Sequence, residues 1–127
     1  MKALEAIQKI EKEGKKEVVV WGSGKPLREF LYVDDFVDAA LFLMQNYNEE
    51  EVINVGSGMN ISISHLAQLI VEIVGFSGQI IFDKTKPDGT MRKFLDHAKI
   101  KQLGCPPKVP LREGIKKTVE SILRSQV

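Results

Sequence analysis

A valine-rich run that ends in a glycine-rich turn constrains the fold of this chain most. The β-branched residues of Glu17–Trp21 predict a buried strand. A turn is predicted next, from Gly22, Gly24 and Pro26, and the apolar residues Phe30–Val33 predict a second short strand. The chain is therefore expected to pass from one strand into another here, and not from a strand directly into a helix.

Helices with one apolar face alternate with short strands through the rest of the sequence. The expected helices are residues 2–14, a helix that Asp34 or Asp35 caps and that reaches about Gln45, Ile63–Val74 between Ser62 and Gly75, a short helix from Asp96 to Leu103, and Leu111–Leu123. The further expected strands are Val52–Val55 and Gln79–Phe82, with a polar loop at Asp83–Met91. This order indicates an α/β fold with too few strands for a full doubly wound sheet. We expect a small lobe that packs on a larger sheet, with strand edges and apolar faces exposed where partner strands are missing.

Length and composition exclude several classes of protein. The 127 residues are enough for one domain, which we assign to residues 1–127. A net charge of +1 argues against nucleic acid as a partner. The sequence has no apolar run of about 20 residues, so we expect no membrane span. A single cysteine cannot form an internal disulfide, which favours a reducing compartment, and we expect a cytoplasmic protein.

Two Gly-Ser-Gly clusters raise the question of phosphate binding. Gly22-Ser23-Gly24 follows a strand, but the helix that a dinucleotide-binding turn needs does not come after it. We therefore interpret it as a tight reversal that uses positive φ angles. A helix begins soon after Gly56-Ser57-Gly58, so an anion could bind at its amino end, although a plain turn between strand and helix is the more common structure.

Arg28 and Trp21 each have two interpretations. A guanidinium binds a diphosphate with fixed bidentate geometry, but Arg28 could equally form an ion pair with an acid near it in the sequence. Those acids are Glu29, Asp34 and Asp35. Trp21 could stack on a base or a sugar, whereas general burial tendencies favour core packing.

The loop that contains Pro87-Asp88-Gly89-Thr90 is the other candidate binding segment. Cations surround one acid in this turn, which suits a ligand that carries phosphates and hydroxyls, and an ordinary solvated turn is the alternative. His65 and His97 have no second ligand at metal-binding spacing, so we expect no metal site. Cys105 has no nearby histidine base and is a poor candidate nucleophile.

These segments together resemble the C-terminal part of the GDP-L-fucose synthases, which are extended short-chain dehydrogenases of the NAD-dependent epimerase/dehydratase family. The resemblance covers about residues 18–123 and is carried by VVVWGSGKPLREFLYVDD, INVGSGMNISISHLAQLIVEIVGF and FDKTKPDGTMRKFLD. REFLYVDD is shared by many nucleotide-sugar enzymes, whereas VVVWGSG together with KPDGTMRK is more specific. The resemblance implies the substrate-binding lobe of a Rossmann-type enzyme whose N-terminal Rossmann core is missing.

The resemblance also implies a site and an activity. Substrate contacts fall on Trp21, Arg28, Asp88 and Lys93, with Val20 lining the pocket. The full-length enzyme would convert GDP-4-keto-6-deoxy-D-mannose to GDP-L-fucose with NADPH. The family's NADP fingerprint and its Ser-Tyr-Lys catalytic set lie upstream of the matched region, so no catalytic, cofactor-binding or metal-binding residue is assigned here. This chain alone is expected to be inactive and to bind no NADPH.

The expected partners are a GDP-sugar, the missing Rossmann domain and, because apolar faces should be exposed, a second copy in a homodimer. Two alternative functions stay open on the sequence. One is another nucleotide-sugar epimerase, dehydratase or reductase. The other is a non-catalytic module that binds nucleotide or protein.

Overall fold

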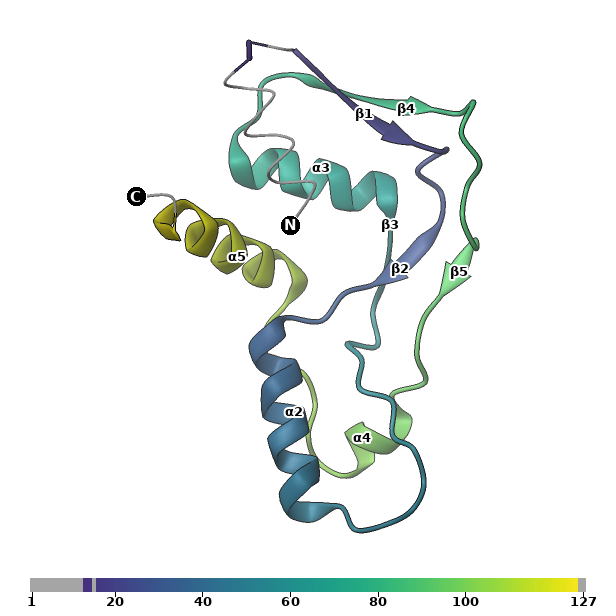
Figure 1. The fold of residues 1–127 in the computed structure, drawn as a ribbon, viewed down its shortest axis with the longest axis vertical. Coiled ribbons are helices and arrows are strands. Elements are labelled where there is room, and N and C mark those ends of the chain that lie inside the picture. The colour runs from purple at the N-terminus through teal and green to yellow at the C-terminus, as the bar shows by residue number, and fades with distance from the viewer. Residues whose placement is uncertain (1–12, 15, 126–127) are drawn as a thin grey trace.

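The computed structural model describes residues 13–14 and 16–125. The predicted helix over residues 2–14 lies outside the described residues, apart from a turn at its last two positions. Strands β1 (Glu17–Trp21) and β4 (Gln79–Asp83) form a parallel two-stranded sheet, with Glu17 opposite Gln79 and Trp21 opposite Asp83 (Figure 1). Both strands were predicted, and the α/β fold class is confirmed.

The main apolar core lies between this sheet and helix α3 (Ile63–Val74). Val18 and Phe76 are buried at its centre, and half-buried apolar side chains pack around them: Val20, Ile70, Val71, Val74 and Ile80. Figure 1 shows α3 along the sheet, with α5 (Leu111–Ser125) beside α3. The Arg112 guanidinium joins the two helices through an ion pair of 2.9 Å with Glu72. Because β1 is fixed on this core, the turn that follows it has a defined position.

A second, three-stranded sheet links the two halves of the molecule. Its order is β3 (Asn60–Ser62), β2 (Leu27–Glu29) and β5 (Arg92–Lys93). Strand β2 pairs antiparallel with β3 and parallel with β5. In Figure 1 this sheet lies between the β1, β4 and α3 layer and the helices α2 (Val33–Asn46) and α4 (Ala98–Gln102).

Two predicted strands are wrong. The second strand is Leu27–Glu29 and not Phe30–Val33, because the hydrogen-bonding partners of β2, in β3 and β5, lie opposite the earlier residues. Residue Val33 instead begins α2. Val52–Val55 is also not a strand, and it has no strand partner among the described residues. An extended apolar segment needs such a partner before it becomes a strand.

Helix ends follow local sequence signals in one case and long-range contacts in another. The Ser62 hydroxyl accepts a hydrogen bond from the His65 backbone N–H, and Gly75 ends α3 at φ 71°, as predicted. The predicted aspartate cap of α2 is wrong, because Tyr32 is the N-cap residue and makes no side-chain cap bond. Asp35 is buried and accepts hydrogen bonds from the backbone N–H groups of Lys108 and Val109, at 3.0 and 2.8 Å.

The short helix α4 is also shifted from its predicted bounds. Its cap residue is His97, and the Asp96 carboxylate accepts a hydrogen bond of 2.9 Å from the backbone N–H of Ala98, the first residue of the helix. Asp96 therefore shapes the turn into α4 without being the cap. The loop predicted at Asp83–Met91 is irregular from residue 84 onward and runs into β5, whereas Asp83 is the last residue of β4.

Large apolar side chains are exposed along one side of α2. Val33, Val37, Leu41 and Met44 recur at helical spacing, and Met44 is 82% exposed. This agrees with the expectation of uncovered apolar faces. Among the described residues, no helix combines the length and the apolar character that crossing a membrane requires.

Candidate functional site

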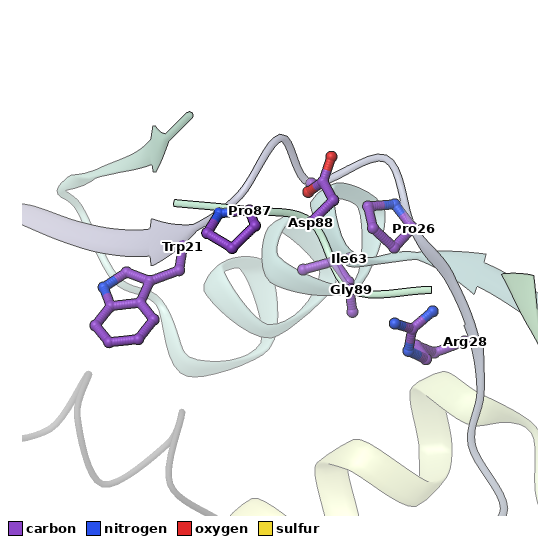
Figure 2. Close-up of a pocket in the computed structure, with 8 residues that line it drawn as sticks. Trp21, Pro26, Arg28, Ile63, Pro87, Asp88 and Gly89 are labelled. Atoms are coloured by element: carbon purple, nitrogen blue, oxygen red, sulfur yellow. The ribbon is translucent and has the colours of Figure 1, made fainter. Parts of the chain in front are cut away.

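An open pocket of about 260 Å³ lies where the turn after β1, the start of β2 and the loop after β4 meet. Figure 2 shows Trp21 at one end and Arg28 at the other, with the backbone of the β4–β5 loop between them. The pocket is lined by Trp21, Gly24, Pro26, Arg28, Ile63, Pro87, Asp88 and Gly89. Three of the five predicted substrate contacts are therefore brought together here.

The turn Gly22-Ser23-Gly24 binds an acid of the chain itself. The Ser23 backbone N–H donates to Asp88 Oδ1 at 2.7 Å, and the Ser23 hydroxyl donates to Asp88 Oδ2 at 2.6 Å. These two bonds, the hydroxyl bond first, lower the pKa of Asp88 below its usual value, and the charge of Lys25 adds to the effect. Gly22 and Gly24 have φ angles of 90° and 74°, so the predicted tight reversal is confirmed.

Both glycines of this turn are also required by close packing. A Cβ atom on Gly22 would collide with the Asp88 carboxylate. A Cβ atom on Gly24 would lie 2.6 Å from the Phe82 ring. The turn is thus held between β4 and the following loop, which fixes one wall of the pocket.

Arg28 does not form the ion pair with a nearby acid that was one of the two roles predicted for it. Its Nη1 donates to the carbonyl oxygens of Leu27 and Thr90, each at 2.7 Å. Among the described residues it has no carboxylate partner, since Glu29 and Asp35 are bound elsewhere. The hydrogen bonds to described residues leave Nη2 and Nε available, and this edge of a guanidinium can bind a phosphate bidentately.

Trp21 does not pack in the core. Its side chain is 74% exposed, which overturns the interpretation that burial tendencies favoured. Because successive side chains of a strand point to opposite faces, Val20 points into the core while Trp21 points away from it. The Lys86 ammonium lies 5.6 Å from the indole centroid. An exposed indole on a fixed strand is available for stacking on a planar ligand.

The other two predicted contacts lie outside the pocket lining. Val20 is half-buried and packs against the core pair Val18 and Phe76. Lys93 is exposed and lies opposite Arg28 in the register of β2 and β5. Directly opposed residues of neighbouring strands share a face of the sheet, so the Arg28 and Lys93 side chains leave the sheet on the same face.

The sequence reasoning missed Glu29, which organises the second glycine cluster. Its Oε1 accepts hydrogen bonds from the Gly58 backbone N–H at 2.7 Å and the Ser57 hydroxyl at 3.4 Å, and its Oε2 accepts from the Leu95 N–H at 2.9 Å. Burial raises the pKa of Glu29, but these donors outweigh it and the pKa is lowered overall. A Cβ on Gly56 would collide with the carboxylate. The Gly-Ser-Gly pattern indicated that an anion could bind close to the backbone here, and the anion that does so is the Glu29 carboxylate.

The remaining candidates take structural positions. His65 lies in the first turn of α3, and the His97 imidazole lies against Gly58, where a Cβ atom would collide with it. Cys105 is half-buried with a free thiol. Within the part of the chain that the structure describes, no three His, Cys, Asp or Glu residues are grouped so that they could hold a metal ion.

Comparison with known proteins gives the chain relatives over most of its length. Residues 2–56 match the model of the NAD dependent epimerase/dehydratase family. GDP-L-fucose synthase 1 of Arabidopsis thaliana is 51% identical over 112 residues, which are 88% of this chain and 35% of that protein.

Two solved structures share the fold. The crystal structure of a GDP-L-fucose synthetase from Naegleria fowleri bound to NADP superposes with a TM-score of 0.89 at 35% identity, over 97% of this chain and 39% of that one. The structure of UDP-glucose 4-epimerase from Thermotoga maritima, solved with UDP-glucose, superposes with a TM-score of 0.82 at 32% identity. The match covers 98% of this chain and 40% of that one.

The chain spans little more than a third of the length of these relatives. The match to the family model, the identity above 50% and the shared fold agree with one another. Most of this chain is therefore similar in sequence and in fold to one part of the GDP-L-fucose synthases.

Proposed function

We propose that residues 1–127 form the substrate-binding domain of an enzyme of GDP-L-fucose synthase type. In the whole enzyme, GDP-4-keto-6-deoxy-D-mannose is epimerised at C3 and C5, and its C4 ketone is then reduced by NADPH to give GDP-L-fucose. This chain supplies the groups that bind the GDP portion. The catalytic residues and the NADP site belong to a Rossmann domain that we place N-terminal to it.

The observation that carries this proposal is the position of Trp21 and Arg28 at the two ends of one open pocket. The exposed indole offers a flat apolar surface for a base or a sugar ring. The free edge of the Arg28 guanidinium offers paired donors for a diphosphate. Lys93 beside Arg28 adds positive charge on the same face. A nucleoside diphosphate has both of the features that these groups would recognise.

The site acts at a distance from the reacting carbons of the sugar. Binding energy from the nucleotide orients the hexose against catalytic groups elsewhere in the enzyme, so it supports turnover without contributing a reactive group. The chain by itself therefore binds a GDP-sugar and neither turns it over nor holds NADPH. We further expect a cytoplasmic protein, and a homodimer of the whole enzyme.

A second candidate function follows from the likeness to the Thermotoga enzyme, whose name gives a UDP-sugar as its substrate. In that case the pocket would bind the UDP-sugar substrate of a 4-epimerase. It could equally bind the nucleotide-sugar of another epimerase, dehydratase or reductase. A non-catalytic nucleotide-binding module is a third use of the same pocket.

Calorimetric titration of the chain with GDP, UDP and dTDP separates these candidates. We expect GDP to bind most tightly, and Arg28→Ala to weaken GDP binding by about 1.5–3 kcal/mol, the range for hydrogen bonds to charged groups. Arg124→Ala is the matched control, because it removes an equal charge from the last turn of α5. Preference for UDP or dTDP would overturn the GDP assignment. Unchanged binding by Arg28→Ala with a lower melting temperature would give Arg28 a structural role.

The genomic sequence next to this segment distinguishes an enzyme from a module. We expect roughly 180 preceding residues that include a glycine-rich fingerprint and a Tyr-x-x-x-Lys pair, in keeping with the size of a dinucleotide-binding domain. A reading frame that begins at Met1 would support the non-catalytic module.

A further inference from the structure

Ser23 uses its hydrogen-bonding groups within the chain. Its backbone N–H and its hydroxyl both donate to the Asp88 carboxylate, at 2.7 and 2.6 Å. Its hydroxyl oxygen also accepts a hydrogen bond of 3.2 Å from the Lys25 backbone N–H. A serine hydroxyl has one proton, and here Asp88 receives it. Ser23 precedes the pocket residue Gly24, and its hydroxyl proton and backbone N–H are both used within the chain.

The loop that Ser23 holds is the same loop that holds Arg28. Two residues after Asp88, the Thr90 carbonyl accepts a hydrogen bond of 2.7 Å from Arg28 Nη1. The next residue, Met91, accepts a hydrogen bond of 2.8 Å from the Leu27 N–H. Gly89, between Asp88 and Thr90, passes so close to the guanidinium that a Cβ atom there would lie 3.3 Å from Arg28 Nη2. Short backbone contacts thus connect the Asp88 carboxylate to the guanidinium.

We propose that Ser23 is a positioning residue, which fixes the Arg28 guanidinium for an anionic ligand by holding Asp88 and, through it, the Gly89–Thr90 backbone. The proposal rests on the proposed function, since it takes Arg28 to be the diphosphate-binding group. Figure 2 shows the Asp88 carboxylate pointing away from Arg28, so the two side chains are connected through the loop backbone and not directly. The lowered pKa of Asp88 agrees with a carboxylate that stays ionised in this contact.

The geometry gives Asp88 a different role from the one that the sequence indicated. A substrate-binding aspartate would direct its oxygens at ligand hydroxyls. Here each oxygen already accepts a short hydrogen bond from Ser23. The Ser23–Asp88 pair therefore contributes to binding chiefly through the shape of the loop, while Arg28 and Trp21 are the groups that face the ligand.

A titration of the 127-residue chain with GDP, followed by NMR, tests the proposal. Ser23→Ala removes the hydroxyl bond, and we expect it to weaken GDP binding about tenfold, as for one charge-assisted hydrogen bond. Ser23→Thr keeps the hydroxyl and should restore most of the affinity. Ser77→Ala is the matched control, because it removes an exposed hydroxyl from the turn between α3 and β4. If Ser23→Ala is unfolded at the titration temperature, Asp88→Asn tests the same contact by removing the charge.

A double-mutant cycle with Arg28→Ala shows whether the effect passes through Arg28. The proposal predicts that Ser23→Ala weakens GDP binding in the unaltered chain and has almost no effect once Arg28 is alanine. Equal weakening in both backgrounds would overturn the route through Arg28. Affinity of Ser23→Ala equal to that of Ser77→Ala would overturn the positioning role and leave the proposed function standing. No GDP binding by the unaltered chain would overturn the proposed function, and this inference with it.

Discussion

The two Gly-Ser-Gly turns of this chain have the same sequence and different structural roles. Each lies around a carboxylate that comes from elsewhere in the chain, Asp88 for residues 22–24 and Glu29 for residues 56–58. The first pair is exposed and lies at the pocket. In the second pair the acid, Glu29, is half-buried and joins β2 to two separate segments. In both glycine-serine turns a carboxylate approaches the backbone closely, and in both cases the chain supplies that carboxylate itself.

The difference between the turns locates the ligand-binding groups. Since Asp88 occupies the donors of Ser23, and Glu29 those of the Ser57 hydroxyl and the Gly58 N–H, we propose that a phosphate is recognised by Arg28, whose hydrogen bonds to described residues use only Nη1. The Glu29 turn should matter for folding, and the Asp88 turn for binding. Each of the following changes tests that division.

Glu29→Ala should have the largest effect, and the effect should be on stability. It removes the acceptor of the Gly58 and Leu95 backbone N–H groups. We expect a loss of about 2–3 kcal/mol in the free energy of unfolding, the range for hydrogen bonds to a charged group that is partly shielded from water. Urea denaturation measures it. Glu50→Ala, which removes an exposed carboxylate from the loop after α2, is the control, and an equal result for both variants would show that Glu29 does not organise its turn.

Alanine at Gly22 and at Gly58 should separate the two turns. Both positions have positive φ, so each substitution should destabilise the chain by about 1–2 kcal/mol from backbone strain alone. Gly104→Ala provides the matched reference, because its φ is 88° and a Cβ there would meet nothing within 4 Å. Only Gly22→Ala, which displaces Asp88, should also weaken GDP binding in a calorimetric titration. Weaker GDP binding by Gly58→Ala would contradict the division of roles.

The pH dependence of stability should show the smallest effect. Because the pKa of Glu29 is lower in the folded chain than its usual 4.5, its contribution to stability is fully present above that pH. It is lost as the pH falls through the folded-state value. Glu29→Gln has no carboxylate to protonate, so its stability should fall less than that of the unaltered chain between about pH 6 and about pH 3.5. Urea denaturation at both pH values measures this, and parallel losses would exclude Glu29 as the titrating group.

The sequence predicted those parts of the fold that local interactions determine. Helix α3 was predicted with both of its ends, because Ser62 and Gly75 act within one turn of the helix. The strand expected at Phe30–Val33 was wrong because β2 is defined by partners that come from distant parts of the chain. Asp35 could not be assigned for the same reason, since the groups that it binds lie 73 and 74 residues away.

The sequence identified several residues of the candidate site but not the contacts that hold them in place. Trp21, Arg28 and Asp88 were identified through a family resemblance, and they do line one pocket. Burial tendencies alone predicted the opposite environment for Trp21, because they cannot tell which face of a strand lies toward the core. The bonds from Ser23 to Asp88 and from Glu29 to Leu95 span 65 and 66 residues, so no local pattern could indicate them.

The most direct test of the account is a GDP titration of the isotope-labelled chain, followed through the NMR signals of the backbone and of the Trp21 indole. Trp21 and Gly89 line the same pocket as Arg28, so their signals should shift together along one binding curve. The same curve should weaken in Arg28→Ala and stay unchanged in Arg124→Ala. Shifts confined to residues 56–58, or the absence of any shift at Trp21 and Gly89, would contradict the claim that this pocket binds a nucleoside diphosphate.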